Sequence, residues 1–168
     1  MSDRSDDIFL PHGGLRMDVC DAPTLAAIVE SLEFAQQTNW DSLRTPHLFM
    51  GLLTISDGAI FNWALRLNAD VYKLQDQFRN LFYQDQEPVP PLQLNREFLS
   101  DNVIRVLRDA WMRARDYGRS SFGPMDLLIT LFTAPNSIVA ECFERIGITT
   151  MRLTELAVLA EQEGSLHG

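Results

Sequence analysis

Residues 43–53 read LRTPHLFMGLL, and this stretch establishes the helical character of the chain. Thr45 followed by Pro46 is typical of a helix start, because threonine caps free backbone amides and proline fits the first helical position. Apolar residues then recur along the stretch, which predicts a helix over 46–55. A second proline start, Gly123-Pro124, lies in the other half of the chain, one residue earlier in register.

A shift of 79 residues superimposes the second half of the sequence on the first half without a gap. Residues 24–38 (TLAAIVESLEFAQQT) and 103–117 (VIRVLRDAWMRARDY) each place apolar residues on one helical face. Further along, Leu48 aligns with Leu127. Because apolar positions mostly meet apolar positions and only two copies fit, the pattern indicates a duplicated helical unit rather than a longer array.

Each copy is expected to contribute four helices. They are predicted near 24–38, 46–55, 58–67 and 70–82 in the first copy and near 101–117, 124–133, 136–146 and 149–162 in the second. Ser100 suits the N-cap of the fifth helix, and Gly118 and Gly147 suit the left-handed residue that follows a helix end. No stretch shows the alternation of an amphipathic strand, so the predicted fold class is all-α.

The helices and their connections suggest five segments within one globular domain. These are an N-terminal extension (1–21), a first repeat (22–83), a proline-rich linker (84–99), a second repeat (100–162) and a tail (163–168). Three prolines in residues 88–91 favour an extended connector. The first 20 residues and the tail from about Glu163 are expected to be frayed or only partly packed.

Charge and hydropathy exclude several classes of function. The 168 residues include 14 basic and 23 acidic side chains, a net charge of -9, and this field repels the phosphates of nucleic acids. No apolar run approaches the roughly 18 residues of a membrane span. The acidic start lacks the apolar stretch of a signal peptide. We therefore expect a cytoplasmic protein that binds neither nucleic acid nor a membrane.

The sequence contains no pattern typical of a catalytic, metal or cofactor site. It lacks both the G-x-S-x-G elbow and the G-x-x-x-x-G-K-[ST] phosphate loop. His12 and His167 lie near opposite ends of the chain, so no metal-ligand spacing exists. Cys20 and Cys142 are too few for a disulfide framework, and Cys142 is expected to be a small core residue. A protein without enzymatic activity or cofactor is predicted.

The quoted stretch also points to a known family. Residues 43–53 resemble the I-G-T-E-H-L-L-L-G-L-L segment of the Clp N-terminal repeat, and residues 67–70 (LNAD) resemble its L-G-V-D. In the second copy, residues 122–128 (FGPMDLL) and 146–148 (IGI) are similar to the same motifs. The resemblance extends over about 22–162, and the two-copy arrangement makes it more specific.

This resemblance implies two tandem four-helix repeats in a pseudo-twofold bundle of eight helices. In the family, that bundle is the N-terminal domain of Clp unfoldases, which docks substrates, adaptors and, in some members, phosphoarginine-marked proteins. The AAA+ modules that follow it there are absent from this sequence, so a free-standing relative is expected, with an excised domain as the alternative. The implied partners are a Clp ATPase, the Clp peptidase ring, or substrate and adaptor peptides.

The resemblance also singles out three candidate binding residues. The family's Glu in G-T-E-H helps to hold the phosphoarginine guanidinium, but Pro46 and Met125 take its place here, and neither side chain accepts such a hydrogen bond. Thr45 and His47 keep the neighbouring motif positions in the first copy, and His47 is expected mainly to support packing. Asp126 replaces that histidine in the second copy, where its carboxylate can partly substitute for the missing one.

Two further surfaces are candidate docking sites. Five arginines lie on or just after the helix predicted over 101–117, namely Arg105, Arg108, Arg113, Arg115 and Arg119. Arg108, Arg115 and Arg119 are seven and four residues apart and so are expected to share a side of the helix. They form either a salt-bridged solvated face or a docking patch for an acidic partner. Near the linker, Phe82 and Tyr83 belong either to the core or to a groove for an apolar peptide or partner helix.

These observations favour a non-catalytic protein- and peptide-binding module of the Clp chaperone–protease system, which acts as an adaptor or regulator of substrate delivery. One alternative is an accessory structural subunit that stabilises the Clp peptidase assembly. Another is a diverged stand-alone decoy that binds peptides or ligands without a Clp ATPase.

Overall fold

The structure is a computed structural model that describes residues 7–167, and the side chains of 7–164. The remaining residues of the predicted extension and tail, 1–6 and 168, lie outside the described part. The described residues form eight α-helices and one short 3-10 helix. Their bounds are α1 (Ala22–Gln37), α2 (Thr45–Leu52), α3 (Gly58–Arg66), α4 (Val71–Phe82), η2 (Arg96–Phe98), α5 (Asp101–Asp116), α6 (Pro124–Thr133), α7 (Ile138–Glu144) and α8 (Thr150–His167).

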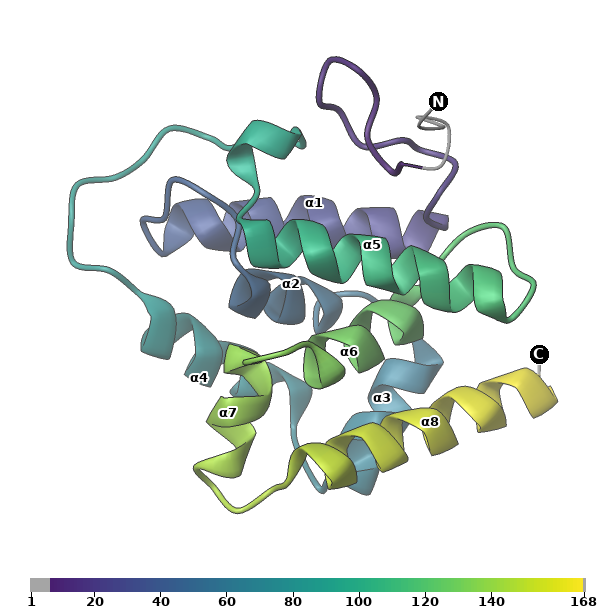
Figure 1. The fold of residues 1–168 in the computed structure, drawn as a ribbon. Coiled ribbons are helices and arrows are strands. Elements are labelled where there is room, and N and C mark those ends of the chain that lie inside the picture. The colour runs from purple at the N-terminus through teal and green to yellow at the C-terminus, as the bar shows by residue number, and fades with distance from the viewer. Residues whose placement is uncertain (1–6, 168) are drawn as a thin grey trace.

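The helices lie in three tiers (Figure 1). Helices α1 and α5 lie at one end, α2 and α6 lie in the middle, and α3, α4, α7 and α8 lie at the other end. Helix α1 packs on α2 in the first repeat, and α5 packs on α6 in the second repeat. A Cβ atom at Gly51 would lie 2.3 Å from the Ala27 carbonyl oxygen, so the contact of α2 with α1 requires glycine there.

The 79-residue shift holds for the structure as well as for the sequence. It carries α1 onto α5 residue for residue, and it carries the first residues of α2 and α4 onto those of α6 and α8. Gly118 and Gly147 follow helix ends at φ of 77° and 89°, as predicted, and their counterparts Asn39 and Asn68 have φ of 67° and 58°. The predicted all-α class and the two tandem four-helix repeats are thus confirmed.

Several predicted helix ends differ from the observed ends. Helix α2 begins at Thr45 with Arg44 in the N-cap position, so Thr45 is the first helical residue and not the cap. At the C-terminus, α8 does not fray at Glu163. The Glu163 carboxylate accepts a hydrogen bond from Asn62, at 2.5 Å, and forms an ion pair with Arg66 on α3. These contacts across helices explain why α8 extends past 162.

Backbone hydrogen bonds connect the segments between helices of one repeat to those of the other repeat. The amide of Leu43, just before α2, donates to the carbonyl of residue 98 at 2.7 Å, and the Leu43 carbonyl accepts from residue 100 at 3.0 Å. Phe122, just before α6, bonds in the same way to residues 19 and 21, at 2.8 and 3.0 Å. The segment that leads into the first helix of one repeat is therefore held by the other repeat.

The N-terminal segment 7–20 is packed, contrary to the expectation that it would fray. Ile8, Phe9, Leu15 and Val19 are buried in the core, with at most 6% of their surface exposed. The sequence did not reveal this burial because these apolar residues lie outside the helical pattern, and their partners come from distant parts of the chain. In the proline-rich linker, two leucines also pack partly against the core, Leu92 and Leu94.

A cluster of aromatic rings joins the two repeats in the core. The Phe143 ring lies 5.8 to 6.2 Å from four others, those of Phe49, Trp63, Phe78 and Phe132. Large and small residues alternate across the 79-residue shift, because Trp63 corresponds to Cys142 and Ala64 corresponds to Phe143. Cys142 is half-buried against this core. The rings therefore fill one shared space instead of two equivalent spaces.

Candidate functional site

His47 and Asp126 correspond under the 79-residue shift and accept equivalent hydrogen bonds at two helix starts. The Nδ1 atom of His47 accepts the backbone N–H of Arg44 at 3.0 Å, at the start of α2. A carboxylate oxygen of Asp126 accepts the backbone N–H of Gly123 at 2.8 Å, at the start of α6. Both side chains therefore satisfy an amide that the helix itself leaves free.

The His47 ring is buried and saturated with hydrogen bonds. Since Nδ1 accepts, the proton of the neutral ring lies on Nε2 and is donated to the Thr38 hydroxyl at 3.0 Å, which in turn donates to the Phe34 carbonyl at 2.7 Å. Burial, followed by the charge of Arg44, lowers the pKa of His47 to about 3. A ring that is neutral near pH 7 and has no free nitrogen suits packing rather than proton transfer or metal binding.

Asp126, whose side chain is only 1% exposed, is the centre of an ionic cluster, which we call the Asp126 cluster and define as Arg113, Arg119, Asp126 and Glu161. Arg119 donates two hydrogen bonds to the Asp126 carboxylate, at 2.5 and 2.7 Å, and Arg113 donates one at 2.6 Å. Arg113 also donates two bonds of 2.9 Å to Glu161. Burial alone would raise the pKa of Asp126, but the bonds from Arg119, the Gly123 amide and Arg113 hold it below its usual value.

The repeats fill the same place with opposite chemistry. The members of the Asp126 cluster correspond under the shift to Phe34, Trp40, His47 and Phe82. In the first repeat, the Trp40 ring lies edge-on to His47 at 5.7 Å, and its indole N–H donates to the Phe82 carbonyl at 2.6 Å. The guanidinium groups on Asp126 belong to the chain itself, so this carboxylate is already occupied.

The three arginines of the predicted patch make different contacts within the chain. Arg108 binds both carboxylate oxygens of Asp7 at 3.1 Å, and the Arg115 guanidinium stacks 4.8 Å from the Trp111 ring. Arg119 lies beyond the end of α5 and turns to Asp126. The three predicted patch residues therefore engage three different partners, although Arg108 and Arg115 remain accessible at the surface.

Thr45 and the groove predicted near Phe82 meet at a small cavity. This cavity has a volume of about 70 Å³ and is lined by residues that include Thr45, His47 and Phe82. Tyr83 is 55% exposed. A space of about 70 Å³ is too small for a large peptide side chain.

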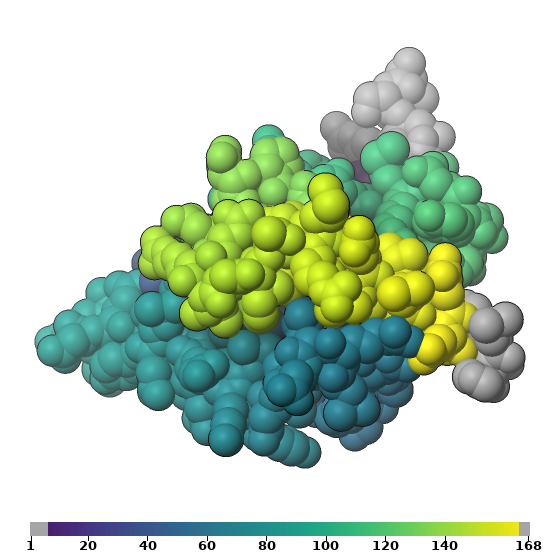
Figure 2. Space-filling model, turned by 90° about the horizontal axis from the view of Figure 1, so that it is seen from below, coloured from purple at the N-terminus to yellow at the C-terminus, as the bar shows by residue number. Residues whose placement is uncertain are grey.

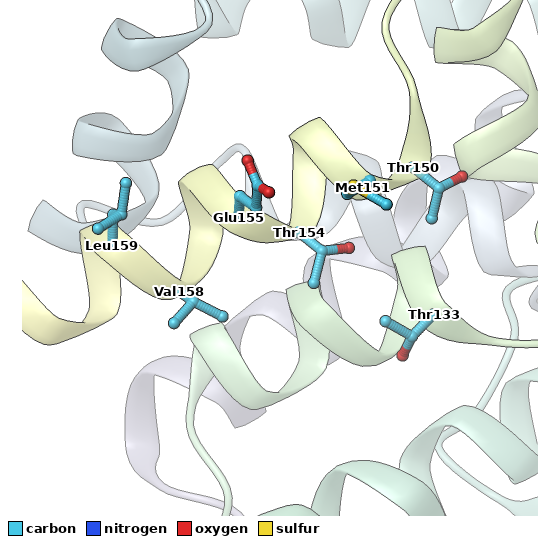
Figure 3. Close-up of a pocket in the computed structure, with 7 residues that line it drawn as sticks. All are labelled: Thr133, Thr150, Met151, Thr154, Glu155, Val158 and Leu159. Carbon is cyan, nitrogen blue, oxygen red and sulfur yellow. The ribbon is translucent and has the colours of Figure 1, made fainter.

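The larger hollow lies along the outer face of α8 (Figure 3). We call it the α8 hollow; it has a volume of about 780 Å³ and is lined by Thr133, Thr150, Met151, Thr154, Glu155, Val158 and Leu159. Thr154 and Val158 point from α8 towards Thr133 at the end of α6, while Glu155 and Leu159 project from the other edge of α8. A second hollow of about 540 Å³ adjoins it, since both are lined by Thr133 and Thr150.

The first repeat has long side chains where the α8 hollow opens. Gln75 corresponds to Thr154, and its amide donates to the Met50 carbonyl at 3.2 Å. Arg79 corresponds to Val158, and its guanidinium lies 5.4 Å from the Phe34 ring. The sequence analysis did not predict the hollow. Two features of the sequence could have indicated it: the replacement of these two long side chains by shorter ones in the second repeat, and the outward-facing apolar residues of the last helix.

The described residues offer neither a metal-binding cluster nor a single membrane-spanning helix. Among residues 7–167, no group of three or more His, Cys, Asp or Glu side chains is placed to hold a metal ion. Within the same part of the chain, no single helix is long and apolar enough to cross a membrane. By length and composition only α6 and α7 together qualify, and they meet at an angle of 71°.

Two cross-paired four-helix repeats with these helix starts define the fold of a Clp-type N-terminal domain. Three solved structures share this fold. The N-terminal domain of the caseinolytic protease associated chaperone ClpD from Arabidopsis thaliana is 19% identical, with a TM-score of 0.65 over 85% of this chain and 94% of that one. The Hsp104 N-terminal domain from Candida albicans is 14% identical, with a TM-score of 0.67 over 83% and 89%.

The third similar structure comes from a study of a malarial protein secretion system. It is 17% identical, with a TM-score of 0.63 over 82% of this chain and 91% of that one. No family model and no curated protein sequence match this chain. The resemblance to the Clp N-terminal repeat is therefore confirmed at the level of the fold.

Proposed function

We propose that the chain is a non-catalytic protein- and peptide-binding module that acts with a Clp chaperone–protease system as an adaptor or regulator of substrate delivery. The observation that carries this proposal is the double-repeat fold, which it shares with the N-terminal domains of ClpD and Hsp104 over more than four-fifths of its length. The open apolar surface on α8 supports it, because a contiguous exposed apolar surface marks an interaction site.

In this proposal the six residues predicted for binding divide into two groups. His47, Asp126 and Arg119 stabilise helix starts, since their polar groups are already bonded within the chain. Arg108 and Arg115 lie on the surface of α5 and contact an acidic segment of the Clp partner. Thr45, at the mouth of the small cavity, is half-buried and makes a minor contact at most.

The direct test is affinity capture of the tagged protein from a lysate of its own organism, with mass-spectrometric identification, followed by reconstitution. Purified Clp ATPase and peptidase are mixed with a fluorescent unfolded substrate, and the chain is titrated in. We expect recovery of a Clp component and a saturable change in the degradation rate. The double variant Arg108→Glu with Arg115→Glu should weaken that effect, whereas Arg145→Glu, an exposed arginine on the opposite tier, should not.

Other outcomes separate the alternatives. A stoichiometric complex with the peptidase ring in the absence of the ATPase, seen by size exclusion, would support an accessory structural subunit. Capture of unrelated proteins with no Clp component, together with an unchanged degradation rate, would exclude a role in the Clp system.

A further inference from the structure

We propose that the α8 hollow binds a peptide segment in which apolar side chains stand next to lysine or arginine. This inference deepens the proposed function, because it names the partner chemistry for one surface of the docking module. Figure 2 looks onto this face, where α8 crosses the molecule between the α3–α4 side and the α5–α6 side.

The α8 hollow has an apolar surface that faces outwards. Met151, Val158 and Leu159 recur at the spacing of one helical face, and the Met151 and Leu159 side chains are 72% and 44% exposed. A helix in a folded chain normally turns such residues inwards. Here the inward face is supplied separately by buried residues of α8, namely Leu153, Leu156, Ala157 and Ala160. The outward-facing residues Met151, Val158 and Leu159 are therefore not needed to fill the core.

The α8 hollow is also negatively charged. Every charged side chain that lines the two adjoining hollows is a carboxylate, Glu155 in the first and Glu141 and Glu144 in the second. Glu141 is paired with Arg145 at 3.0 Å and the Glu144 carboxylate accepts only the Thr150 hydroxyl, so among the described residues Glu155 and Glu144 have no ion pair. Within the described part of the chain, Glu155 has no hydrogen bond or ion pair. The net charge of -9 extends the same sign over the whole molecule. A partner with basic residues beside its apolar side chains is complementary to this surface, and an acidic partner is repelled.

The hollow also contains a polar group without a partner among the described residues. The Thr154 hydroxyl is buried and forms no hydrogen bond with any described residue. A buried hydroxyl of this kind is costly to leave unpaired in the free chain. Thr154 lines the α8 hollow (Figure 3), and its covered hydroxyl meets a backbone group of a bound segment once the side chain rotates about its Cα–Cβ bond.

The two repeats differ at this place. Gln75 and Arg79 occupy the corresponding place in the first repeat, where the Gln75 amide is bonded to the Met50 carbonyl. Thr154 and Val158 are shorter and leave the space open in the second repeat. One chain thus contains both an open site and its closed counterpart, which supplies matched controls.

The test is a fluorescence-anisotropy titration of the full chain with a labelled Gly-Ser peptide that carries two leucines flanked by lysines. Two matched peptides replace the lysines by glutamates or the leucines by serines. We expect saturable binding of the first peptide that weakens as salt is raised, and affinity at least about tenfold lower for each matched peptide. Equal binding of all three peptides, or no binding of the first, would overturn the proposal.

Charge reversal locates the site. Glu155→Lys should lower the affinity for the lysine peptide by about fivefold or more, in line with loss of an exposed ion pair. Asp76→Lys changes the net charge equally at the corresponding position of the first repeat and should leave the affinity unchanged. In the same way, Met151→Asp should abolish binding and Tyr72→Asp should not. Equal effects of Glu155→Lys and Asp76→Lys would show that overall charge binds the peptide, and equal effects of Met151→Asp and Tyr72→Asp would show that the α8 hollow is not the apolar site.

Two other variants test the shape and the hydroxyl. Thr154→Gln combined with Val158→Arg installs the side chains of the first repeat and should lower the affinity at least about tenfold. Thr154→Val removes only the hydroxyl, so it should weaken binding several-fold while the melting temperature stays the same or rises. A lower melting temperature with unchanged peptide affinity would show that the hydroxyl stabilises the fold and does not bind the peptide.

These results are separable from those of the proposed function. Peptide binding without any Clp component in the capture experiment would support the peptide site and contradict the Clp role. Capture of a Clp component by a chain that binds no peptide would support the Clp role and contradict the peptide site. Self-association of the free chain that Met151→Asp prevents would identify a second copy as the occupant, and it too would overturn the peptide proposal.

Discussion

His47 and Asp126 lie 79 residues apart and accept the same kind of backbone hydrogen bond, from Arg44 and from Gly123, at the first turns of α2 and α6. Their surroundings differ in charge. Aromatic and hydroxyl groups enclose the imidazole, while two guanidinium groups enclose the carboxylate. One geometric requirement, an acceptor for a free amide at a helix start, is thus met by two side chains with different titration behaviour.

The neutral state of His47 makes stability depend on pH. Its pKa in the folded chain is lowered from 6.5 to about 3, so the unfolded chain takes up the proton first as the pH falls. The stabilisation is complete above about pH 6.5 and is lost progressively towards pH 3. Between pH 7.5 and 5, we expect the free energy of unfolding to fall by at most about 2 kcal/mol, as measured by urea denaturation.

The control for this prediction is His47→Gln. Glutamine at this helical position also accepts the Arg44 amide hydrogen but does not titrate. The variant should show a flat stability profile over the same pH range. A profile as steep as that of the original chain would assign the pH dependence to other groups.

The Asp126 cluster predicts a large loss of stability when its acceptor is removed. Asp126→Asn leaves Arg113 and Arg119 without their shared carboxylate, and the Asp126 side chain is only 1% exposed. We expect the free energy of unfolding to fall by about 2 kcal/mol, measured by denaturant titration, because Arg113 keeps its bonds to Glu161 and the Arg119 side chain is 42% exposed. Arg145→Ala breaks an exposed ion pair with Glu141 and should cost less than about 0.5 kcal/mol. Equal losses for the two variants would contradict the assigned role of the cluster.

The shared aromatic cluster predicts that the repeats unfold together. Phe143→Ala removes a buried ring that contacts rings from both repeats, so we expect a loss of about 4 kcal/mol. The unfolding curve should remain a single transition when followed by both tryptophan fluorescence and circular dichroism. Phe61→Ala, at a ring that is 37% exposed, is the milder control. Two separate transitions would show that the repeats are independent.

The packing of segment 7–20 gives a fourth prediction. Ile8 is fully buried, so Ile8→Ala should lower the free energy of unfolding by about 2 to 4 kcal/mol. Met17 belongs to the same segment but is 65% exposed, and Met17→Ala should change stability by less than about 0.5 kcal/mol. Unchanged stability in both variants would mean that the segment is a tether and not a part of the core.

Local sequence patterns predicted most of the fold. The helical periodicity and the 79-residue shift predicted the eight helices, and the glycines at 118 and 147 predicted the ends of two of them. Such features depend on residues close in sequence. The packing of Ile8 and the extension of α8 past 162 depend on distant partners such as Arg66, and a local pattern contains no information about them.

The candidate site was harder to predict for the same reason. The motif positions of His47 and Asp126 were recognisable, but which groups surround them is decided by residues on other helices, such as Glu161. The α8 hollow depends on the lengths of Thr154 and Val158 relative to the space between α6 and α8. Only the comparison with Gln75 and Arg79 in the first repeat offered a signal in the sequence itself.

The exchange of leading segments between the repeats also bears on the ancestry of the chain. A one-repeat ancestor would have had no partner for the backbone of residues 43 or 122 except in a second molecule, so the present fold corresponds to a fused dimer. In a single chain the two repeats are present in a fixed one-to-one ratio and need not be identical. Their core residues differ accordingly, since Trp63 corresponds to Cys142 and Ala64 corresponds to Phe143.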